Sequence, residues 1–101
     1  MLRGARERAK NKNLEFTLTE SWVDEQMGGG VCAVTGLPFQ MDSGVYGRCG
    51  PFTPSIDRID ASLGYTPANC RIVVWAINMA LSEWGEETFT QIAKAFLEMK
   101  R

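Results

Sequence analysis

The alternation of apolar and polar residues predicts how the first third of the chain folds. Leu14, Phe16 and Leu18 alternate with polar residues, which indicates a short extended segment that packs on one side. Thr19 follows with the residue type of a helix N-cap, and the apolar spacing after it predicts a helix over residues 20–27. Residues 1–12 have a helix-forming composition with few large apolar groups.

Short apolar runs separated by turn residues predict strands in the middle of the chain. Residues 31–39 (VCAVTGLPF) indicate a strand, a tight turn at Thr35-Gly36 and a return. Residues 40–53 are rich in Gly, Ser, Asp and Pro, which indicates a loop with a loose hairpin around Val45-Tyr46.

The span from residue 54 to residue 85 has the pattern of a strand, an exposed connection, a second strand and a helix. We expect strands over residues 54–58 and 71–74, antiparallel if the connection is hairpin-like. The helix is expected from about Trp75 to near Gly85. Beyond it, residues 86–101 show helical spacing of apolar groups, and we expect this amphipathic helix to pack on the core through Phe89, Ile92, Ala93, Phe96 and Leu97.

Length and composition predict one small α+β domain over residues 1–101. Its parts are an N-terminal arm over 1–13, a ββα core region over 31–85 and the C-terminal helix over 86–101. With 45% hydrophobic residues the chain supports a modest core. No apolar run has the length of a membrane span and no signal-peptide pattern opens the chain, so we expect a cytoplasmic protein with no membrane partner, in the host cytoplasm if it is viral.

Charge is distributed unevenly, although the formal net charge is only −1. The first 13 residues carry a surplus of four positive charges, which leaves −5 on the rest of the chain. This segment is either a solvated or frayed helix, or an arm that contacts phosphates. Its cationic residues are Arg3, Arg6, Arg8, Lys10 and Lys12.

The chain contains no histidine and three cysteines. The absence of histidine removes the usual general base at neutral pH and the commonest metal ligand. Three cysteines leave one unpaired, which argues against a disulfide framework. Any catalysis must therefore use carboxylates, Asn, Tyr, Arg or Lys.

A set of motifs spread over residues 5–97 resembles the HNH (ββα-metal, His-Me finger) nucleases, and small phage-type members in particular. The matching residues are CAVTG at 32–36, PSIDRID at 54–60, Gly64-Tyr65, Asn69 and Asn78. The resemblance implies a ββα-metal fold in which Asp57 and Asn78 hold a divalent cation, Mg²⁺ or Mn²⁺. Asn69 falls at the position of an Asn that orients the catalytic His.

The resemblance also has two departures. A structural zinc in this family uses two Cys pairs, whose positions here are Cys32 and Thr35, then Val74 and Ile77. Structural zinc is therefore not expected, and we expect the apolar replacements to pack together. A remade site of Cys32, Cys49 and Cys70 lacks the spacing of a zinc motif, so idle or buried thiols are the better interpretation.

The second departure is Arg58, which stands where the catalytic His is expected. An arginine stays protonated and cannot act as a general base, but it can bind a phosphate through two hydrogen bonds. Three alternatives for the base stay open: Asp60, Tyr65 if its phenol is deprotonated, or hydroxide on the metal.

The leading hypothesis is a metal-dependent nuclease that hydrolyses DNA, with Arg58, Arg71 and the basic arm on the nucleic acid. The alternative is an inactive module of the same fold that binds nucleic acid or inhibits a host protein. A simpler interpretation keeps Asp57, Arg58 and Asp60 as an ion-paired strand end, Asn69 as a loop-stabilising residue and Asn78 as a polar residue with backbone partners.

Overall fold

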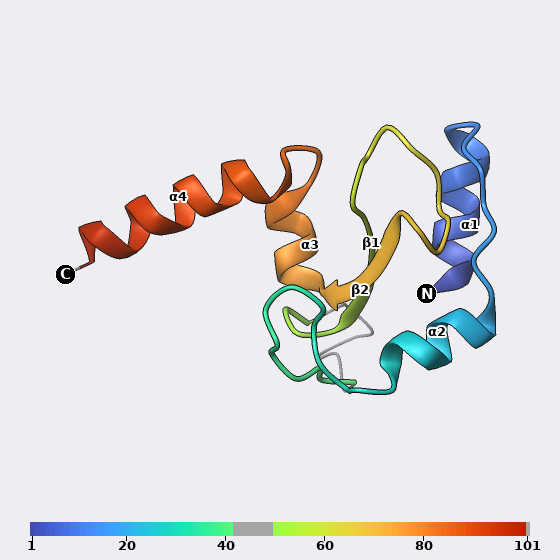
Figure 1. Ribbon diagram of the computed structural model, residues 1–101, viewed down its shortest axis with the longest axis horizontal. Helices are drawn as coiled ribbons and strands as arrows, with labels where there is room; N and C mark the ends of the chain where they lie inside the picture. Colours follow the sequence, from blue (N-terminus) through green and yellow to red (C-terminus); the bar gives the residue numbers. More distant parts are fainter. Residues whose placement is uncertain (42–49, 101) are drawn as a thin grey trace.

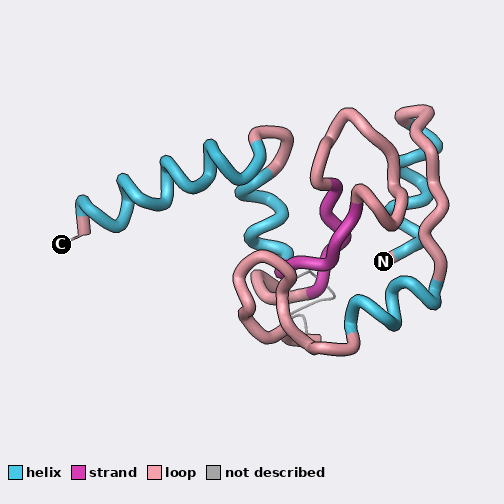
Figure 2. The backbone as a smooth tube through the Cα atoms, viewed as in Figure 1, coloured by secondary structure: helices cyan, strands magenta, loops and turns pink. Residues whose placement is uncertain are grey.

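The computed structural model describes residues 1–41 and 50–100, and in these ranges the protein has four helices and one two-stranded antiparallel sheet (Figures 1 and 2). This confirms the α+β class. Among residues 1–41 and 50–100, none of the helices has the length and apolar composition of a membrane-spanning segment. The elements in chain order are α1 (Leu2–Asn11), α2 (Glu20–Met27), β1 (Pro54–Arg58), β2 (Cys70–Val74), α3 (Trp75–Leu81) and α4 (Gly85–Met99).

The two strands pair in a register that separates an apolar face from a charged one. Ile56 lies opposite Ile72, and the next pair along the ladder is Asp57 with Arg71. Because side chains alternate across a strand, these pairs point to opposite faces of the sheet. The Ile56 face packs on α1 and α2, while Asp57 lies on the face toward α3.

Helix α1 packs on the sheet and is part of the core. Its Leu2, Ala5 and Ala9 are buried and lie on one helical face. The interpretation of residues 1–12 as a fully solvated or frayed segment is therefore wrong. The buried face consists of one leucine and two alanines, so the segment has too few large apolar residues to reveal it in the sequence.

Helix α2 has the predicted bounds and the predicted cap. The hydroxyl oxygen of Thr19 accepts a hydrogen bond from the backbone N–H of Trp22 over 3.1 Å. Trp22 and Val23 are buried in the same cluster as the α1 residues. The prediction is confirmed, and both of its signals, the N-cap residue and the apolar spacing, depend only on residues close in sequence.

The extended segment over residues 14–18 packs against the connection between the strands. Phe16 forms a parallel bridge with Tyr65, whose backbone N–H donates to the carbonyl of Glu15 over 2.8 Å. Gly64 is required at this contact, because a Cβ there would lie 2.5 Å from the carbonyl oxygen of Glu15. These contacts hold the connection between β1 and β2 against the extended segment over residues 14–18.

A second apolar cluster covers part of the other face of the sheet. Cys32, Val74 and Ile77 belong to it, so the expectation that these residues pack together is confirmed. The strand and return predicted over residues 31–39 are reduced to one bridge between Val31 and Pro38, because a tight turn occupies residues 32–37. The hairpin predicted around Val45-Tyr46 lies outside the described residues, as does Cys49.

Helix α3 begins directly after β2, without a side-chain cap. The N–H groups of Trp75 and Ala76 instead donate to the carbonyls of Thr53 and Pro51, over 2.7 and 2.9 Å. These bonds tie the start of α3 to the segment that leads into β1. The helix ends at Leu81, earlier than predicted, where the chain turns with a positive φ at the next residue.

Helix α4 extends away from the rest of the molecule (Figure 1). None of its residues is buried, and Ile92, Phe96 and Leu97 are 62%, 59% and 63% exposed. The predicted packing of this helix on the core is therefore wrong. The amphipathic spacing was recognised, but the turn between α3 and α4 directs the apolar face away from the core.

Candidate functional site

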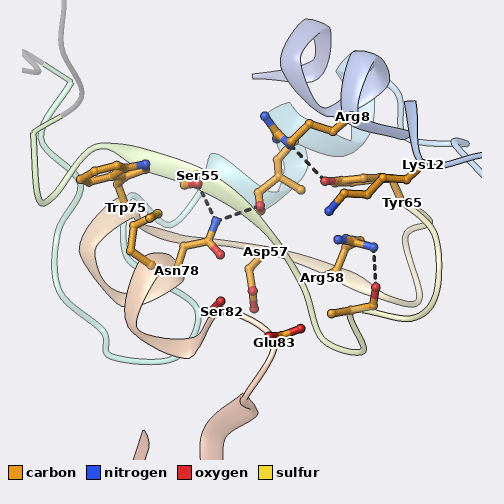
Figure 3. Close-up of a pocket in the computed structure, with 13 residues that line it drawn as sticks. Arg8, Lys12, Ser55, Asp57, Arg58, Tyr65, Trp75, Asn78, Ser82 and Glu83 are labelled. Atoms are coloured by element: carbon orange, nitrogen blue, oxygen red, sulfur yellow. Dashed lines mark hydrogen bonds between the residues drawn. The ribbon is translucent and has the colours of Figure 1, made fainter. Parts of the chain in front are cut away.

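A groove of about 590 Å³ runs along β1 between α3 on one side and α1 on the other (Figure 3). Its walls come from α1, β1, the connection between the strands, α3 and the turn that follows α3. The lining residues are Arg8, Lys12, Ser55, Ile56, Asp57, Arg58, Ala61, Tyr65, Trp75, Asn78, Met79, Ser82 and Glu83.

Helix α3 supplies one wall through residues at helical spacing. Trp75, Asn78 and Met79 follow the i, i+3, i+4 pattern, which places them on a single face of α3, and Ser82 follows directly after the helix. Because α3 is anchored at its first turn, this face has a fixed position relative to β1.

Asn78 is held against β1 by its amide nitrogen. Nδ2 donates to the hydroxyl of Ser55 over 2.7 Å and to the carbonyl of Ile56 over 3.0 Å. A carbonyl accepts only from the nitrogen, so this bond fixes the amide orientation and turns Oδ1 the other way. Figure 3 shows that oxygen on the side of Asp57. Asn78 therefore has both a backbone partner and an oxygen facing the groove.

Asp57 is a buried carboxylate, only 4% exposed, at the floor of the groove. Its Oδ2 accepts a hydrogen bond from Nε of Arg71, which is its partner across the sheet, over 2.9 Å. Burial raises the pKa of Asp57, and this effect outweighs the opposing attraction of Arg71. The ionised carboxylate of Asp57 therefore lowers the free energy of unfolding.

Arg71 links this carboxylate to α4. Its Nη1 donates to Glu86 over 2.8 Å, so the guanidinium bridges two acids. Burial alone would lower the pKa of Arg71. The hydrogen bonds from its guanidinium to Glu86 and Asp57 have a larger effect in the opposite direction, so the pKa of Arg71 is raised. Arg71 was predicted to contact nucleic acid, whereas here it serves an internal ion-pair network.

The opposite end of the groove is basic and built around Tyr65. The guanidinium carbon of Arg58 lies 4.9 Å from the ring centre of Tyr65, within the range of a cation–π contact. Nη1 of Arg58 also donates to the carbonyls of Ala61 and Leu63, over 2.6 and 3.0 Å. These contacts fix the guanidinium while using one of its three nitrogens.

Helix α1 adds two further cations at this end. Nε of Arg8 donates to the phenolic oxygen of Tyr65 over 3.1 Å, and Lys12 lines the groove beside it (Figure 3). The other arm cations lie elsewhere: Arg6 stacks over Phe16 at 5.1 Å, and Arg3 and Lys10 are exposed outside the groove lining.

Asn69 shapes the connection between the strands. Its Oδ1 accepts from the backbone N–H of Asp60, and its Nδ2 donates to the carbonyls of Asp60 and Gly64 over 3.0 and 2.9 Å. It is buried and lies outside the groove lining. Its geometry is that of a loop-stabilising residue.

Asp60 is turned toward its own loop. Its carboxylate accepts from the hydroxyl and backbone N–H of Ser62, over 2.6 and 2.9 Å, and these bonds lower the pKa of Asp60. Residues two apart in a strand share a face, but β1 ends at Arg58, so this relationship does not extend from Arg58 to Asp60. Asp60 is not among the described residues that line the groove.

The cysteines are divided between the two clusters. Cys70 belongs to the cluster with α1 and α2, where burial raises its pKa to about 11, and Cys32 belongs to the other. Burial raises the pKa of Cys32, but hydrogen bonds from the side chain of Thr35 and from backbone groups lower it more.

Sequence reasoning missed Glu83, which lines the groove beside Asp57 (Figure 3). Its position depends on the turn between α3 and α4, where Ser82 has a φ of 44° and Gly85 a φ of 84°. Gly85 signals a helix end in the sequence, but nothing marks the positive φ of Ser82. With Glu83 the groove holds a second carboxylate near the candidate metal ligands.

The oxygen donors of the groove suit a hard cation. No group of three or more His, Cys, Asp or Glu gathers within residues 1–41 and 50–100. A cation here would bind Asp57, the Oδ1 of Asn78 and water, the kind of sparse oxygen set that Mg²⁺ accepts when a substrate phosphate completes it. No family model, curated protein or solved structure matches the chain.

Proposed function

We propose that the protein is a metal-dependent nuclease with an HNH-like core, and that its groove binds and hydrolyses a DNA phosphodiester. The observation that carries this proposal is one groove that presents Asp57 and the Oδ1 of Asn78 at one end and Arg58, Arg8 and Lys12 at the other. Cation-binding oxygens beside phosphate-binding cations are what phosphodiester chemistry requires.

The order of the elements supports the proposal. The resemblance calls for two antiparallel strands followed by a helix, with the Asp on the first strand and the final Asn on the helix. β1, β2 and α3 have this order, with Asp57 on β1 and Asn78 on α3.

The polar residues at the two ends of the groove divide the work between the cation and the phosphate. Asp57 and Asn78 hold Mg²⁺ or Mn²⁺, which when bound stabilises the charge that develops on the phosphate and the leaving oxygen. Arg58 binds the phosphate with the nitrogens that its loop contacts leave available. Arg8 and Lys12 bind the neighbouring backbone phosphate.

Glu83 is the proton acceptor in this account. Arg58 stays protonated, Asp60 is bound to Ser62, and the phenol of Tyr65 accepts a hydrogen bond from Arg8. Glu83 is exposed, lies in the groove and carries a carboxylate, so it takes the proton of the attacking water.

A second candidate function is DNA binding without cleavage. The observation that favours it is the ion pair between Asp57 and Arg71, because a cation must compete with a guanidinium that already neutralises the carboxylate. In this case the basic end of the groove acts alone.

The test is nicking of supercoiled plasmid in Mg²⁺ or Mn²⁺. We expect the wild type to nick DNA, Asp57→Ala to abolish nicking, and Glu83→Gln to lower the rate by about 100-fold or more. Glu87→Gln is the matched control, because Glu87 is exposed on α4 outside the groove. If the folded wild type nicks nothing with either cation yet binds DNA in a salt-dependent way, the second function replaces the first.

A further inference from the structure

The groove contains an aromatic side chain to which the proposed hydrolysis gives no role. Trp75 is 37% exposed and lines the groove, and Met79, one helical turn later on the same face of α3, is 59% exposed. Figure 3 shows Trp75 at one end of the groove and Arg58 at the other, with Asp57 between them. The groove therefore has an apolar surface at the end away from its cations.

The position of Trp75 is fixed by the backbone. It is the first residue of α3, and its N–H donates to the carbonyl of Thr53 over 2.7 Å. Proteins that bind single-stranded nucleic acid combine a positively charged groove, which follows the backbone, with aromatic side chains on which the bases stack. Trp75 and the cations of this groove supply both parts.

Tyr65, the other aromatic residue among those that line the groove, does not offer its ring to a base. It is only 4% exposed, and the guanidinium carbon of Arg58 lies 4.9 Å from its ring centre. The ring of Phe16 packs against it with a centre-to-centre distance of 6.1 Å. A base that stacks in the described groove therefore stacks on Trp75.

The charge of the groove is small for a site that holds a duplex. Among the described residues, the cations that line it are Arg8, Lys12 and Arg58, beside the carboxylates of Asp57 and Glu83. A protein that holds duplex DNA through about 6–10 phosphate contacts needs a larger basic surface. Stacking adds affinity without further charge, but it requires a base whose face is not covered by its neighbours in a double helix.

We propose that the preferred substrate of the groove is an unpaired DNA strand, with one base stacked on Trp75 and the backbone passing Asp57 toward Arg58. This inference rests on the proposed function, because it names the form of DNA that the same groove binds. A duplex binds through the cations alone and more weakly, since a paired base reaches Trp75 only after it is flipped out of the stack. Supercoiled plasmid remains a substrate, because negative supercoiling favours local unpairing.

The test compares the affinity of the full chain for a labelled single strand of about 12 nucleotides and for the blunt duplex of the same sequence. Fluorescence anisotropy in EDTA measures both, and it does not depend on hydrolysis. We expect the wild type to bind the single strand at least about 10-fold more tightly, and Trp75→Ala to lose most of this preference. Trp84→Ala is the matched control, because Trp84 is 64% exposed and lies outside the groove lining.

A second measurement does not depend on how well Trp75→Ala folds. Trp75→Phe keeps an aromatic ring in place, and circular dichroism checks that its fold is unchanged. Because a base that stacks on an indole quenches its fluorescence, the single strand should quench the tryptophan emission of the wild type. Trp84→Phe should retain this quenching, and Trp75→Phe should lose most of it.

Equal or tighter binding of the duplex by the wild type would contradict the proposal. An equal loss for both forms of DNA in Trp75→Ala, or undiminished quenching in Trp75→Phe, would also contradict it. A failure of the proposed hydrolysis gives a different result. A protein that prefers the single strand through Trp75 but nicks no plasmid supports this inference and refutes only the cleavage.

Discussion

Arg8 donates a hydrogen bond from Nε to the phenolic oxygen of Tyr65 over 3.1 Å, and this bond joins α1 to the connection between the two strands. The guanidinium of Arg58 lies over the ring of the same tyrosine. Tyr65 thus holds two guanidinium groups at one end of the groove. The sequence of α1 has the charge of a basic arm. In the structure, this helix forms a fixed wall of the candidate site.

This geometry predicts that the arm cations contribute unequally to DNA binding. Arg8→Ala should weaken binding of a short duplex and reduce the slope of log affinity against log salt by about one. Lys10→Ala removes an exposed cation outside the groove and is the matched control, with a smaller loss. Fluorescence anisotropy at several salt concentrations measures both, and equal losses in the two variants would contradict the fixed groove.

Asp57→Asn should alter how stability depends on pH. Burial raises the folded-state pKa of Asp57 above its unfolded value, so its ionised form lowers the free energy of unfolding at neutral pH. That cost disappears as the pH falls through the folded pKa toward the unfolded value of about 3.9. The uncharged Asn avoids the cost at every pH.

Urea denaturation at pH 7 and pH 4 tests this expectation. The variant should be at least as stable as the wild type at pH 7, and its advantage should shrink at pH 4. A variant that is clearly less stable at pH 7 would mean that the Arg71 ion pair outweighs the burial of the carboxylate.

Gly64→Ala should destabilise the fold by about 1–3 kcal/mol, because the new methyl group would press on the backbone of Glu15. Gly29→Ala is the matched control, since a Cβ at Gly29 meets nothing within 4 Å. Chemical denaturation of both variants measures the difference. Equal stabilities would show that the connection does not pack on residues 14–18 as closely as described.

Arg58→His should lower cleavage, although it restores the residue type expected at that position. The substitution removes the contacts with Ala61 and Leu63 and a permanent positive charge from the basic end of the groove. Plasmid nicking by the variant, with its circular dichroism as a control for folding, measures the effect. A faster rate would mean that Glu83 is not the base and that the scaffold lacks only its histidine.

The elements could be predicted where their signals are local. The Thr19 cap and the span of β1 depend on neighbouring residues, and both agree with the structure. The shortened α3 and the exposed α4 depend on the turn at Ser82 and Gly85. Gly85 signals that a helix ends near it, but the positive φ of Ser82 has no distinct sequence signal. Helical spacing shows that α4 has an apolar face, but it does not show what covers that face.

The candidate site was only partly predictable for a related reason. Asp57, Arg58 and Asn78 come from one continuous stretch, and the groove brings them together. Arg8 and Glu83 enter from elements whose placement depends on tertiary packing. Asp60 and Arg71 lie close in sequence to the groove residues but do not line the groove. Asp60 accepts a hydrogen bond from Ser62, and Arg71 donates to Asp57 and Glu86.

In the proposed mechanism, a divalent cation and a DNA phosphate occupy one groove and bind cooperatively. The most direct measurement is the affinity for a short phosphorothioate duplex that resists hydrolysis, at constant ionic strength, with and without Mn²⁺. We expect tighter binding with Mn²⁺ for the wild type, and no such gain for Asp57→Asn. An affinity that Mn²⁺ does not change, or a gain that persists in Asp57→Asn, would contradict it.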